Sequence, residues 1–263
     1  MLKVQNVTKV FNLDLNPEDR KTALDDVSLE IREGEFVTVI GGNGSGKTTL
    51  LNVIAGTVAP DSGRIFIDGE DVTALKDFQR AKYIGFVFQD PLSGTAANMS
   101  LEENLALAHR RGKKKCLRWG FNKSLAQVFR EKLATLNLGL EDRLSERIGF
   151  LSGGQRQAVT LLMATLGKPK LLLLDEHTAA LDPKIAKTVL ELTEGIVRGN
   201  GLTAVMVTHN MRDALKYGDR LLMLNNGRIV LDVSGEEKKK LRIEDLLRKF
   251  ETSDDSPDGK PVS

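Results

Sequence analysis

The chain has 263 residues, 41% of them hydrophobic, so it can bury a full core and lies near the length at which one domain begins to divide into subdomains. Its 38 basic and 36 acidic residues give a formal net charge of +2, which argues against a nucleic-acid-binding protein held on phosphate by bulk charge. The single cysteine excludes a disulfide framework, and neither a membrane-spanning apolar run nor a signal-peptide pattern is present, so we expect a cytosolic chain.

The first part of the chain predicts strands and one helix. Residues 2–11 and 23–31 alternate apolar and polar side chains and predict two antiparallel strands joined by a polar loop. The apolar run 36–40 predicts a buried strand, and residues 49–55 predict a helix.

Between that strand and that helix lies the segment 41–48, GGNGSGKT, which fits the pattern G-x-x-x-x-G-K-[ST]. In this pattern the glycines let the backbone turn its N–H groups onto phosphate oxygens at the positive end of a helix. Lys47 would reach the β and γ phosphates, and the Thr48 hydroxyl would ligate Mg²⁺. The other interpretation is a glycine-rich turn with an exposed lysine, so the pattern by itself favours a nucleotide site without saying what the nucleotide drives.

The middle of the chain changes character. Residues 64–67 predict a short strand that turns at Asp68 and Gly69, and residues 83–88 predict a strand that ends at Gln89. From about 99 to 166 almost no strand-like alternation remains, and residues 101–109 and 124–138 have the spacing of amphipathic helices. We therefore expect an inserted helical lobe. The basic run 110–118 inside it is interpreted as a solvated loop, the alternative being contact with anionic lipid headgroups or an acidic partner.

The last part of the chain predicts alternating strands and helices. The five residues 151–155, LSGGQ, precede a helix that we expect to begin at Arg156, and the strand 171–174 ends in Asp175 and Glu176, whose carboxylates would emerge where ligands bind in open α/β sheets. A strand at 203–207 ends near His209. We also expect helices at 184–197, 211–217 and 241–250, a hairpin at 221–233, and a disordered tail at 251–263.

In this order, the phosphate loop, Gln89, the LSGGQ segment, Asp175 with Glu176, residues 180–182 and His209 resemble the ATP-binding-cassette ATPases over about residues 1–235. The resemblance implies an α/β fold: a P-loop NTPase core with a mainly parallel sheet, an N-terminal antiparallel β subdomain and an inserted α-helical subdomain. It implies one ATPase domain at 1–250, with the core at about 1–90 and 167–235 and the helical lobe at about 91–166.

The resemblance also implies an ATP hydrolase that uses Mg²⁺. Glu176 would polarise the attacking water, assisted by His209, Gln89 and Lys47. Thr48, Gln89 and Asp175 would hold Mg²⁺. Phe11 would stack on adenine, although it could instead be a core residue of its strand. The nucleotide-binding set implied by the resemblance is Phe11, Gly41, Asn43, Gly44, Ser45, Gly46, Lys47, Thr48, Thr49, Ser152, Gly153, Gly154, Gln155 and Asp182.

In the family, Ser152 to Gln155 would close on the ATP of a second copy, so the resemblance implies a head-to-tail homodimer with Asp182 near its contact. It further implies membrane permease subunits, indirectly an extracytoplasmic solute-binding protein, no nucleic acid, and a place on the inner face of the cell membrane. The segment 91–98 after Gln89 is longer than usual and would encode recognition of the permease.

The chain departs from the family pattern at three positions. His177 follows Glu176 where proline is usual, and Ala158 and Met163 stand where arginine is common. None of these positions carries a predicted phosphate or metal ligand, so we expect hydrolysis to be retained. Our leading hypothesis is the ATPase subunit of a bacterial importer for a small solute, such as an amino acid or related compound. The alternatives are the ATPase of an exporter or lipoprotein-release complex, and a soluble cassette ATPase of iron–sulfur assembly.

Overall fold

The computed structural model describes residues 1–12, 19–112 and 123–254. The chain divides into two compact units. The first consists of Met1–Asp77 and Thr203–Ser263, and the second consists of Phe78–Leu202. The second unit is therefore wider than the helical lobe we expect at about 91–166, because it also includes two strands and the long helix that follows them.

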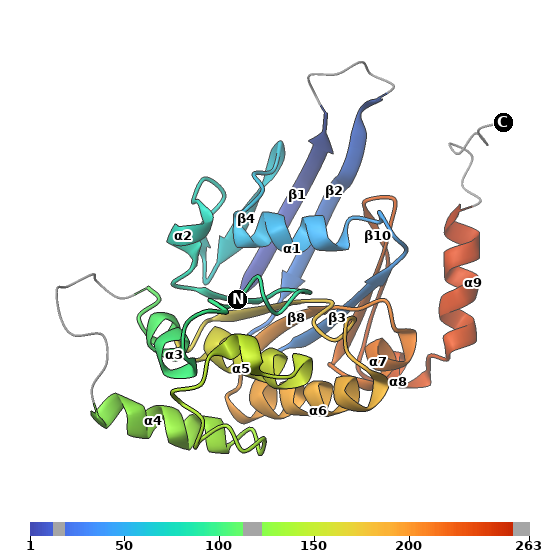
Figure 1. The fold of residues 1–263 in the computed structure, drawn as a ribbon. Coiled ribbons are helices and arrows are strands. Elements are labelled where there is room, and N and C mark those ends of the chain that lie inside the picture. Colours follow the sequence, from blue (N-terminus) through green and yellow to red (C-terminus); the bar gives the residue numbers. More distant parts are fainter. Residues whose placement is uncertain (13–18, 113–122, 255–263) are drawn as a thin grey trace. The chain divides into compact units, whose positions relative to one another are not determined.

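The first unit contains a four-stranded antiparallel sheet with the order β2-β1-β4-β5 (Figure 1). Its strands are β1 (Leu2–Phe11), β2 (Lys21–Ile31), β4 (Ser62–Ile67) and the short β5 (Glu70–Asp71). In β2 the second half alternates buried and exposed residues, which is the pattern of a sheet with one face on the core. The predicted antiparallel pair at the start of the chain is confirmed by the pairing of Leu2 with Ile31 and of Phe11 with Lys21.

The first unit also contains the strands β10-β9-β3-β8, in that order, of a second sheet. Strand β3 (Phe36–Gly41) is buried along its whole length and runs parallel to β8 (Thr203–Val207) and to β9 (Arg220–Asn225), while β10 (Arg228–Ser234) closes an antiparallel hairpin with β9. A strand that is flanked by parallel strands and covered on both faces needs a continuous apolar run, and the sequence of β3 supplies it.

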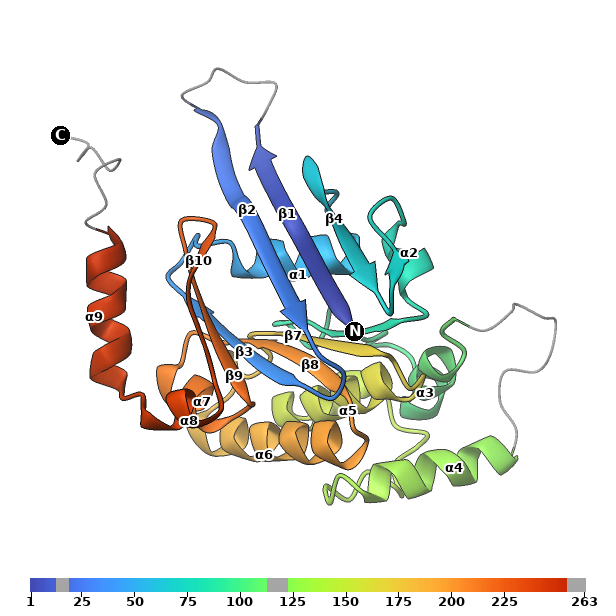
Figure 2. The same cartoon turned by 180° about the vertical axis from the view of Figure 1, so that it is seen from behind.

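Four helices complete the first unit: α1 (Lys47–Ala55), α7 (Met211–Lys216), α8 (Gly235–Lys240) and α9 (Ile243–Asp254). Helix α9 follows α8 and is the last helix of the described chain (Figure 2). Its Leu246 is fully buried in a cluster with Ile40 of β3 and Met223 of β9, which fixes this helix on the first unit. The C-terminal helix is therefore part of the fold rather than an appendage.

The second unit pairs β6 (Ile84–Val87) in parallel with β7 (Leu171–Asp175) and carries most of the long helices. These are α3 (Leu101–His109), α4 (Lys123–Ala134), α5 (Gly153–Thr165) and α6 (Pro183–Gly199), with the four-residue α2 (Asp77–Arg80) at the unit boundary and a 3₁₀ turn at Ile148–Phe150. Helix α5 packs against α3, α4 and α6, and its apolar face lies in a buried cluster with residues such as Phe129 and Leu133. The elements described between β6 and β7 are helical, as predicted.

The differences from the sequence predictions lie mainly at helix ends. Helix α1 begins two residues earlier than expected, and α5 begins at Gly153 rather than Arg156, because Ser152 caps it. Helix α4 ends at Ala134 rather than at residue 138. Asn137, which lies inside the expected helix, adopts the left-handed conformation at φ 53°. Helices α2 and α8 were not anticipated; both are short and mostly polar, so they lack a helical apolar period.

The predicted disordered tail was wrong at its start, because α9 continues through Asp254; the remainder of the tail lies outside the described residues. Most of the basic run, from residue 113 onward, also lies outside the described residues. None of the described helices combines the length and the apolar character that a membrane span requires.

Candidate functional site

The phosphate loop of the first unit has a backbone that only glycine allows at several positions. Gly44 and Gly46 adopt the left-handed region, at φ 80° and φ 102°. A Cβ atom on Gly46 would lie 2.3 Å from the carbonyl oxygen of Ala23, and one on Gly41 would lie 2.4 Å from the carbonyl oxygen of Leu224. The glycines at these positions are therefore explained by backbone conformation and by close contact with neighbouring strands.

Lys47 is buried inside this loop, with 6% of its surface exposed. Its Nζ atom donates hydrogen bonds to the carbonyl oxygens of Gly41 and Gly42, each at 2.9 Å. The interpretation of this residue as an exposed lysine on a turn is therefore wrong. The ammonium is held within the loop, where it can exchange backbone carbonyls for phosphate oxygens at little conformational cost.

Two further features of the loop suit an anion. The cap residue of α1 is Gly46, which supplies no side-chain hydrogen bond to the N-terminus of the helix, the end that favours an anion. The Ser45 hydroxyl is buried and has no hydrogen-bond partner within the described part of the chain. A buried hydroxyl of this kind is costly to leave unsatisfied, and a phosphate oxygen would satisfy it. Thr48, Thr49 and Asn43 lie at the same helix start and are at least partly exposed.

Phe11 lies at the end of β1 and is 38% exposed, so it is not a core residue. It stands opposite Lys21 of β2, and the Lys21 Nζ atom lies 3.6 Å from the position that a Cβ atom on Gly44 would occupy. The Lys9 ammonium lies 5.5 Å from the centre of the Phe11 ring. The aromatic ring is therefore carried by a strand pair whose end reaches the phosphate loop, and Lys21 is a residue of this region that sequence reasoning missed.

His209 leaves the sheet at the same edge as the phosphate loop. Strand β8 runs parallel to β3, with Val207 opposite Val39, and the Thr208 N–H donates to the Val39 carbonyl at 3.1 Å. The His209 side chain is exposed, two residues beyond the end of β8. Burial raises the pKa of the nearby Asp213 carboxyl, and the charges of Lys216 and His209 offset only part of that shift.

In the second unit, the acidic strand end is positioned by β7. All five residues of β7 are buried, and the last of them, Asp175, is 8% exposed. Glu176 follows at φ 43°, a left-handed conformation that is uncommon for a residue with a long side chain. Val87 of β6 pairs with Leu174 of β7, so Gln89 leaves the sheet at the edge where the two carboxylates emerge. The structure thus brings together Gln89, Asp175 and Glu176 of the predicted set.

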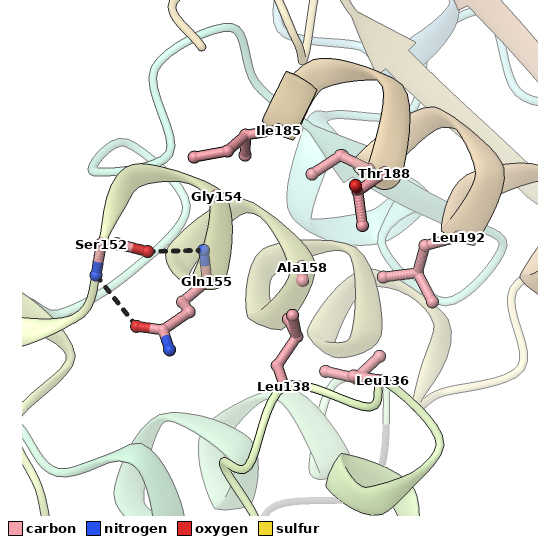
Figure 3. Close-up of a pocket in the computed structure, with 10 residues that line it drawn as sticks. Leu136, Leu138, Ser152, Gly154, Gln155, Ala158, Ile185, Thr188 and Leu192 are labelled. Carbon is pink, nitrogen blue, oxygen red and sulfur yellow. Dashed lines mark hydrogen bonds between the residues drawn. The ribbon is translucent and has the colours of Figure 1, made fainter. Parts of the chain in front are cut away.

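The LSGGQ segment forms the capped start of α5 (Figure 3). The Ser152 hydroxyl accepts a hydrogen bond from the Gln155 N–H at 3.3 Å, and the Gln155 side-chain oxygen accepts one from the Ser152 N–H at 3.2 Å. This reciprocal arrangement is a capping box. The backbone N–H groups of Gly153 and Gly154 are the remaining donors of the first turn. The helix predicted after this segment is confirmed, and it starts three residues earlier than expected.

Gly154 also sets the distance between α5 and α6. A Cβ atom at this position would lie 2.2 Å from the Cγ2 atom of Ile185, and one on Gly153 would lie 3.3 Å from Leu181. Asp182 caps α6 by accepting a hydrogen bond from the Ile185 N–H at 3.1 Å. The role of Ile185 was missed, because nothing in the local pattern signals a contact between two separate helices.

Two more residues of the second unit were missed or underestimated. The Arg156 guanidinium donates to the carbonyl oxygens of Gly149 and Leu151, which fixes the turn before α5. His177 is almost fully buried, and its Nε2 atom lies 3.0 Å from the Thr193 hydroxyl. That hydroxyl donates to the Val189 carbonyl, so we assign the ring Nε2–H as the donor to Thr193 and His177 as neutral. Burial lowers the pKa of His177 to about 4.

The donor chemistry fits Mg²⁺. Asp175 offers a buried carboxylate at a strand end, and Thr48 offers a hydroxyl in the first turn of α1. Within the described ranges no group of three or more histidine, cysteine or acidic residues could hold a metal. This ligand set suits Mg²⁺ better than a transition metal, because Mg²⁺ is commonly bound through one or two protein oxygens together with water and phosphate.

The chain is similar in sequence to several known proteins. Residues 24–179 match the family model described as ABC transporter. The chain is 46% identical over 256 residues to the tyrosine transport ATP-binding protein of Clostridioides difficile (strain R20291), covering 95% of this chain and 99% of that protein. It is 43% identical over 231 residues to the sulfate/thiosulfate import ATP-binding protein CysA of Xylella fastidiosa (strain 9a5c), covering 87% and 61%.

A solved structure of a dimeric ATP-binding cassette, in a post-hydrolysis state bound to ADP and Pi, is also similar. It superposes with a TM-score of 0.75 at 31% identity, and the match covers 89% of this chain and 98% of that one. The likeness extends to the mixed, mostly parallel sheet and to the antiparallel N-terminal sheet, as the sequence predicts.

Proposed function

The chain belongs to the ABC transporter family, whose cassettes hydrolyse ATP to power transport, and from that premise we propose that it is the ATPase subunit of an importer for a small solute such as an amino acid or a related compound. The import hypothesis is supported by relatives named for tyrosine transport and for sulfate/thiosulfate import. The match to the first of these spans nearly both chains, which favours an amino acid or a related solute. No observation favours an exporter, a lipoprotein-release complex or iron–sulfur assembly.

ATP binding is assigned to the first unit. We expect the backbone of residues 44–48 and the buried Lys47 ammonium to surround the β and γ phosphates, a role supported by the Ser45 hydroxyl, which has no partner in the described chain. Phe11 would provide a face for adenine stacking at the end of β1. Gly41 and Gly46 keep the backbone close enough to its neighbours for the loop to form.

Catalysis is assigned to the strand ends. Glu176 would polarise the attacking water, and its left-handed backbone next to the buried Asp175 is the observation that carries this assignment. Thr48, Gln89 and Asp175 would hold Mg²⁺, which supplies charge neutralisation for the phosphates when bound. His209 would contact the γ phosphate and fix the water. Because phosphoryl transfer passes through a loose transition state, positioning and charge stabilisation provide most of the acceleration.

Assembly is assigned to the start of α5. The N–H groups of Gly153 and Gly154 form a second anion site, and Ser152 and Gln155 fix its geometry through the capping box. We assign this site to the γ phosphate of an ATP bound by a second copy, in a head-to-tail dimer with Asp182 near the contact. The dimeric state of the related cassette supports this assembly. Permease subunits in the membrane, indirectly an extracytoplasmic binding protein, and a place on the inner membrane face complete the proposal.

The test of the mechanism is Glu176→Gln. This change keeps the size of the side chain and removes its basicity, so turnover should fall at least about a hundredfold. ATP binding should remain, so the variant should accumulate an ATP-dependent dimer in size-exclusion chromatography. The matched control is Glu191→Gln on the exposed face of α6, which should turn over as the unaltered chain does. Near-normal turnover of Glu176→Gln would remove Glu176 from the role of base.

The test of the transport assignment is physical association. The chain should co-purify with a polytopic membrane protein from detergent-solubilised membranes, and deletion of its gene should reduce uptake of labelled tyrosine more than uptake of labelled sulfate. Reduced sulfate uptake with normal tyrosine uptake would overturn the proposed solute class. Purification without any membrane protein would instead favour a non-transport cassette.

A further inference from the structure

A cavity of about 290 Å³ lies in the second unit, immediately beside the LSGGQ segment (Figure 3). It is formed between α5, α6 and the residues that follow α4. Its walls include apolar side chains from all three elements, among them Leu138, Ala158, Val189 and Leu192. Neither the phosphate chemistry nor the acidic strand end uses this space.

The packing of the two helices explains why the cavity exists. Gly154 and Ala158 are four residues apart on α5, and Ile185 and Leu192 are seven residues apart on α6, so each pair lies on one helix face. The helices touch at Gly154 and Ile185, where no Cβ atom would fit. One turn along α5 the facing side chain is Ala158, a single methyl group, which leaves the space between the helices unfilled.

Few of the side chains that line the cavity are polar, and the hydrogen bonds that they can still make follow from their existing partners. No charged side chain is among the residues that line the cavity, which excludes an ion as its occupant. At one end, the Gln155 side-chain oxygen is used by the Ser152 N–H, while the amide Nε2 has no partner among the described residues. The Thr188 hydroxyl donates to the Lys184 carbonyl at 3.2 Å and so can only accept a further hydrogen bond.

From these observations we propose that the cavity is a binding site for a small neutral molecule with an apolar body and one hydroxyl group, in contact with the signature helix α5. An apolar cavity of about 150 Å³ holds benzene, so this larger cavity has room for about two fused rings. The ring system would lie against Leu138, Ala158 and Leu192. The hydroxyl oxygen would accept from Gln155 Nε2, or its hydrogen would be donated to Thr188 Oγ1.

The position of the site gives it a consequence for turnover. Ser152, Gly154 and Gln155 line the cavity and also form the capped N-terminus of α5. A bound molecule that holds the Gln155 amide changes the freedom of this helix start, and through it the rate of ATP hydrolysis. This second step rests on the proposed function, whereas binding in the cavity does not.

The binding test uses 2-naphthol as the probe, titrated by calorimetry into the full nucleotide-free chain. One saturable site is expected. Ala158→Leu should fill the cavity and weaken binding at least about tenfold, a loss of about 1.4 kcal/mol. The control is Ala134→Leu, the same change at an exposed position of α4, which should bind as the unaltered chain does. Thr188→Phe offers a second blocking variant at an exposed position, so an unstable Ala158→Leu would not end the test.

The turnover test uses the same variants. Saturating 2-naphthol should change the ATPase rate of the unaltered chain at least about twofold and leave the rate of Thr188→Phe unchanged. Absence of saturable binding, or equal binding by both blocking variants and the unaltered chain, would overturn the site. Binding with no change in rate would overturn the coupling to α5. Full activity of Glu176→Gln would count against the proposed function, and the binding result would stand.

Discussion

The two helix starts that we assign to anion binding are built in opposite ways. Helix α1 of the first unit begins after Gly46, which has no side chain to cap it, and the loop before it encloses a buried ammonium. Helix α5 of the second unit begins after Ser152, whose hydroxyl and partner Gln155 complete a capping box. The loop before α1 encloses the Lys47 ammonium, whereas the Arg156 guanidinium at the start of α5 is directed to the carbonyl oxygens of Gly149 and Leu151.

The difference teaches what each helix start can do alone. A loop that combines a helix N-terminus, a buried lysine and a hydroxyl without a partner among the described residues has the components of a phosphate site within one chain. The start of α5 has part of its donor capacity already satisfied by its own side chains, and the Arg156 guanidinium in its first turn donates to the carbonyl oxygens of Gly149 and Leu151. It is therefore suited to complete a site whose charge is provided elsewhere, which agrees with the proposed dimer.

The largest expected effect comes from removing the charge that distinguishes α1. Lys47→Ala should weaken ATP binding at least about a hundredfold and reduce turnover to background, because a charge-assisted contact to phosphate is lost. Fluorescent-nucleotide titration would measure it. Lys187→Ala, on the exposed face of α6, serves as the control and should bind normally. If Lys47→Ala kept normal affinity, the contrast between the two helix starts would fail.

The next effect concerns His177, the buried histidine between the acidic strand end and α6. Its pKa is lowered to about 4 in the folded chain, against 6.5 for an ordinary histidine, so the unfolded chain binds the extra proton. The contribution of the neutral ring is complete above pH 6.5 and is lost as the pH falls toward 4. The full loss is about 3 kcal/mol, and about 2 kcal/mol should be gone by pH 5.

Urea unfolding at pH 7.5 and pH 5 would measure this loss. His177→Gln keeps a donor for Thr193 but does not titrate, so its stability should fall less between the two pH values than that of the unaltered chain. Carboxyl groups titrate in both chains. The quantity to compare is therefore the loss in free energy of unfolding between pH 7.5 and pH 5 in the unaltered chain and in His177→Gln. Equal falls in both chains would show that His177 does not control this range.

A smaller effect distinguishes two roles of Ser152 at the start of α5: stabilising the helix as a cap, and taking part in the proposed dimer. Helices α3 and α5 both begin with a serine capping box, Ser100 with Glu103 and Ser152 with Gln155. Replacing either serine by alanine should lower the free energy of unfolding by about 1 kcal/mol, since each removes one cap. Only Ser152→Ala should also lower turnover, because only α5 is assigned to the ATP of a second copy. A similar loss of turnover in Ser100→Ala would reduce the role of Ser152 to stability.

The smallest effect is expected at the basic run. Replacing residues 113–115, three lysines, by alanine should leave the ATPase rate of the purified chain unchanged if the run is remote from the nucleotide. Binding to vesicles that contain anionic lipid would decrease if the run contacts headgroups. A changed ATPase rate without vesicles would place the run near the nucleotide site.

Local patterns were sufficient to predict most of the elements, with the short polar helices α2 and α8 as exceptions. The segment 41–48 specifies a strand, a turn and a helix through its glycines, and the apolar runs of β3, β7 and β8 are recognised because each is continuous and of strand length. The capping pair Ser152 and Gln155 is three residues apart and is likewise local. Such features depend on neighbours in the chain, so the amino-acid sequence by itself determined them.

Only the tertiary structure decided which of these residues touch distant parts of the chain. The contact of Gly154 with Ile185 and the burial of His177 against Thr193 each join segments that have no common period or spacing. The cavity beside Ala158 exists because two helices touch at a glycine and the next facing side chain of α5 is a single methyl group. Packing of this kind depends on the combined volumes of side chains from separate elements, and a local sequence pattern carries no information about those volumes.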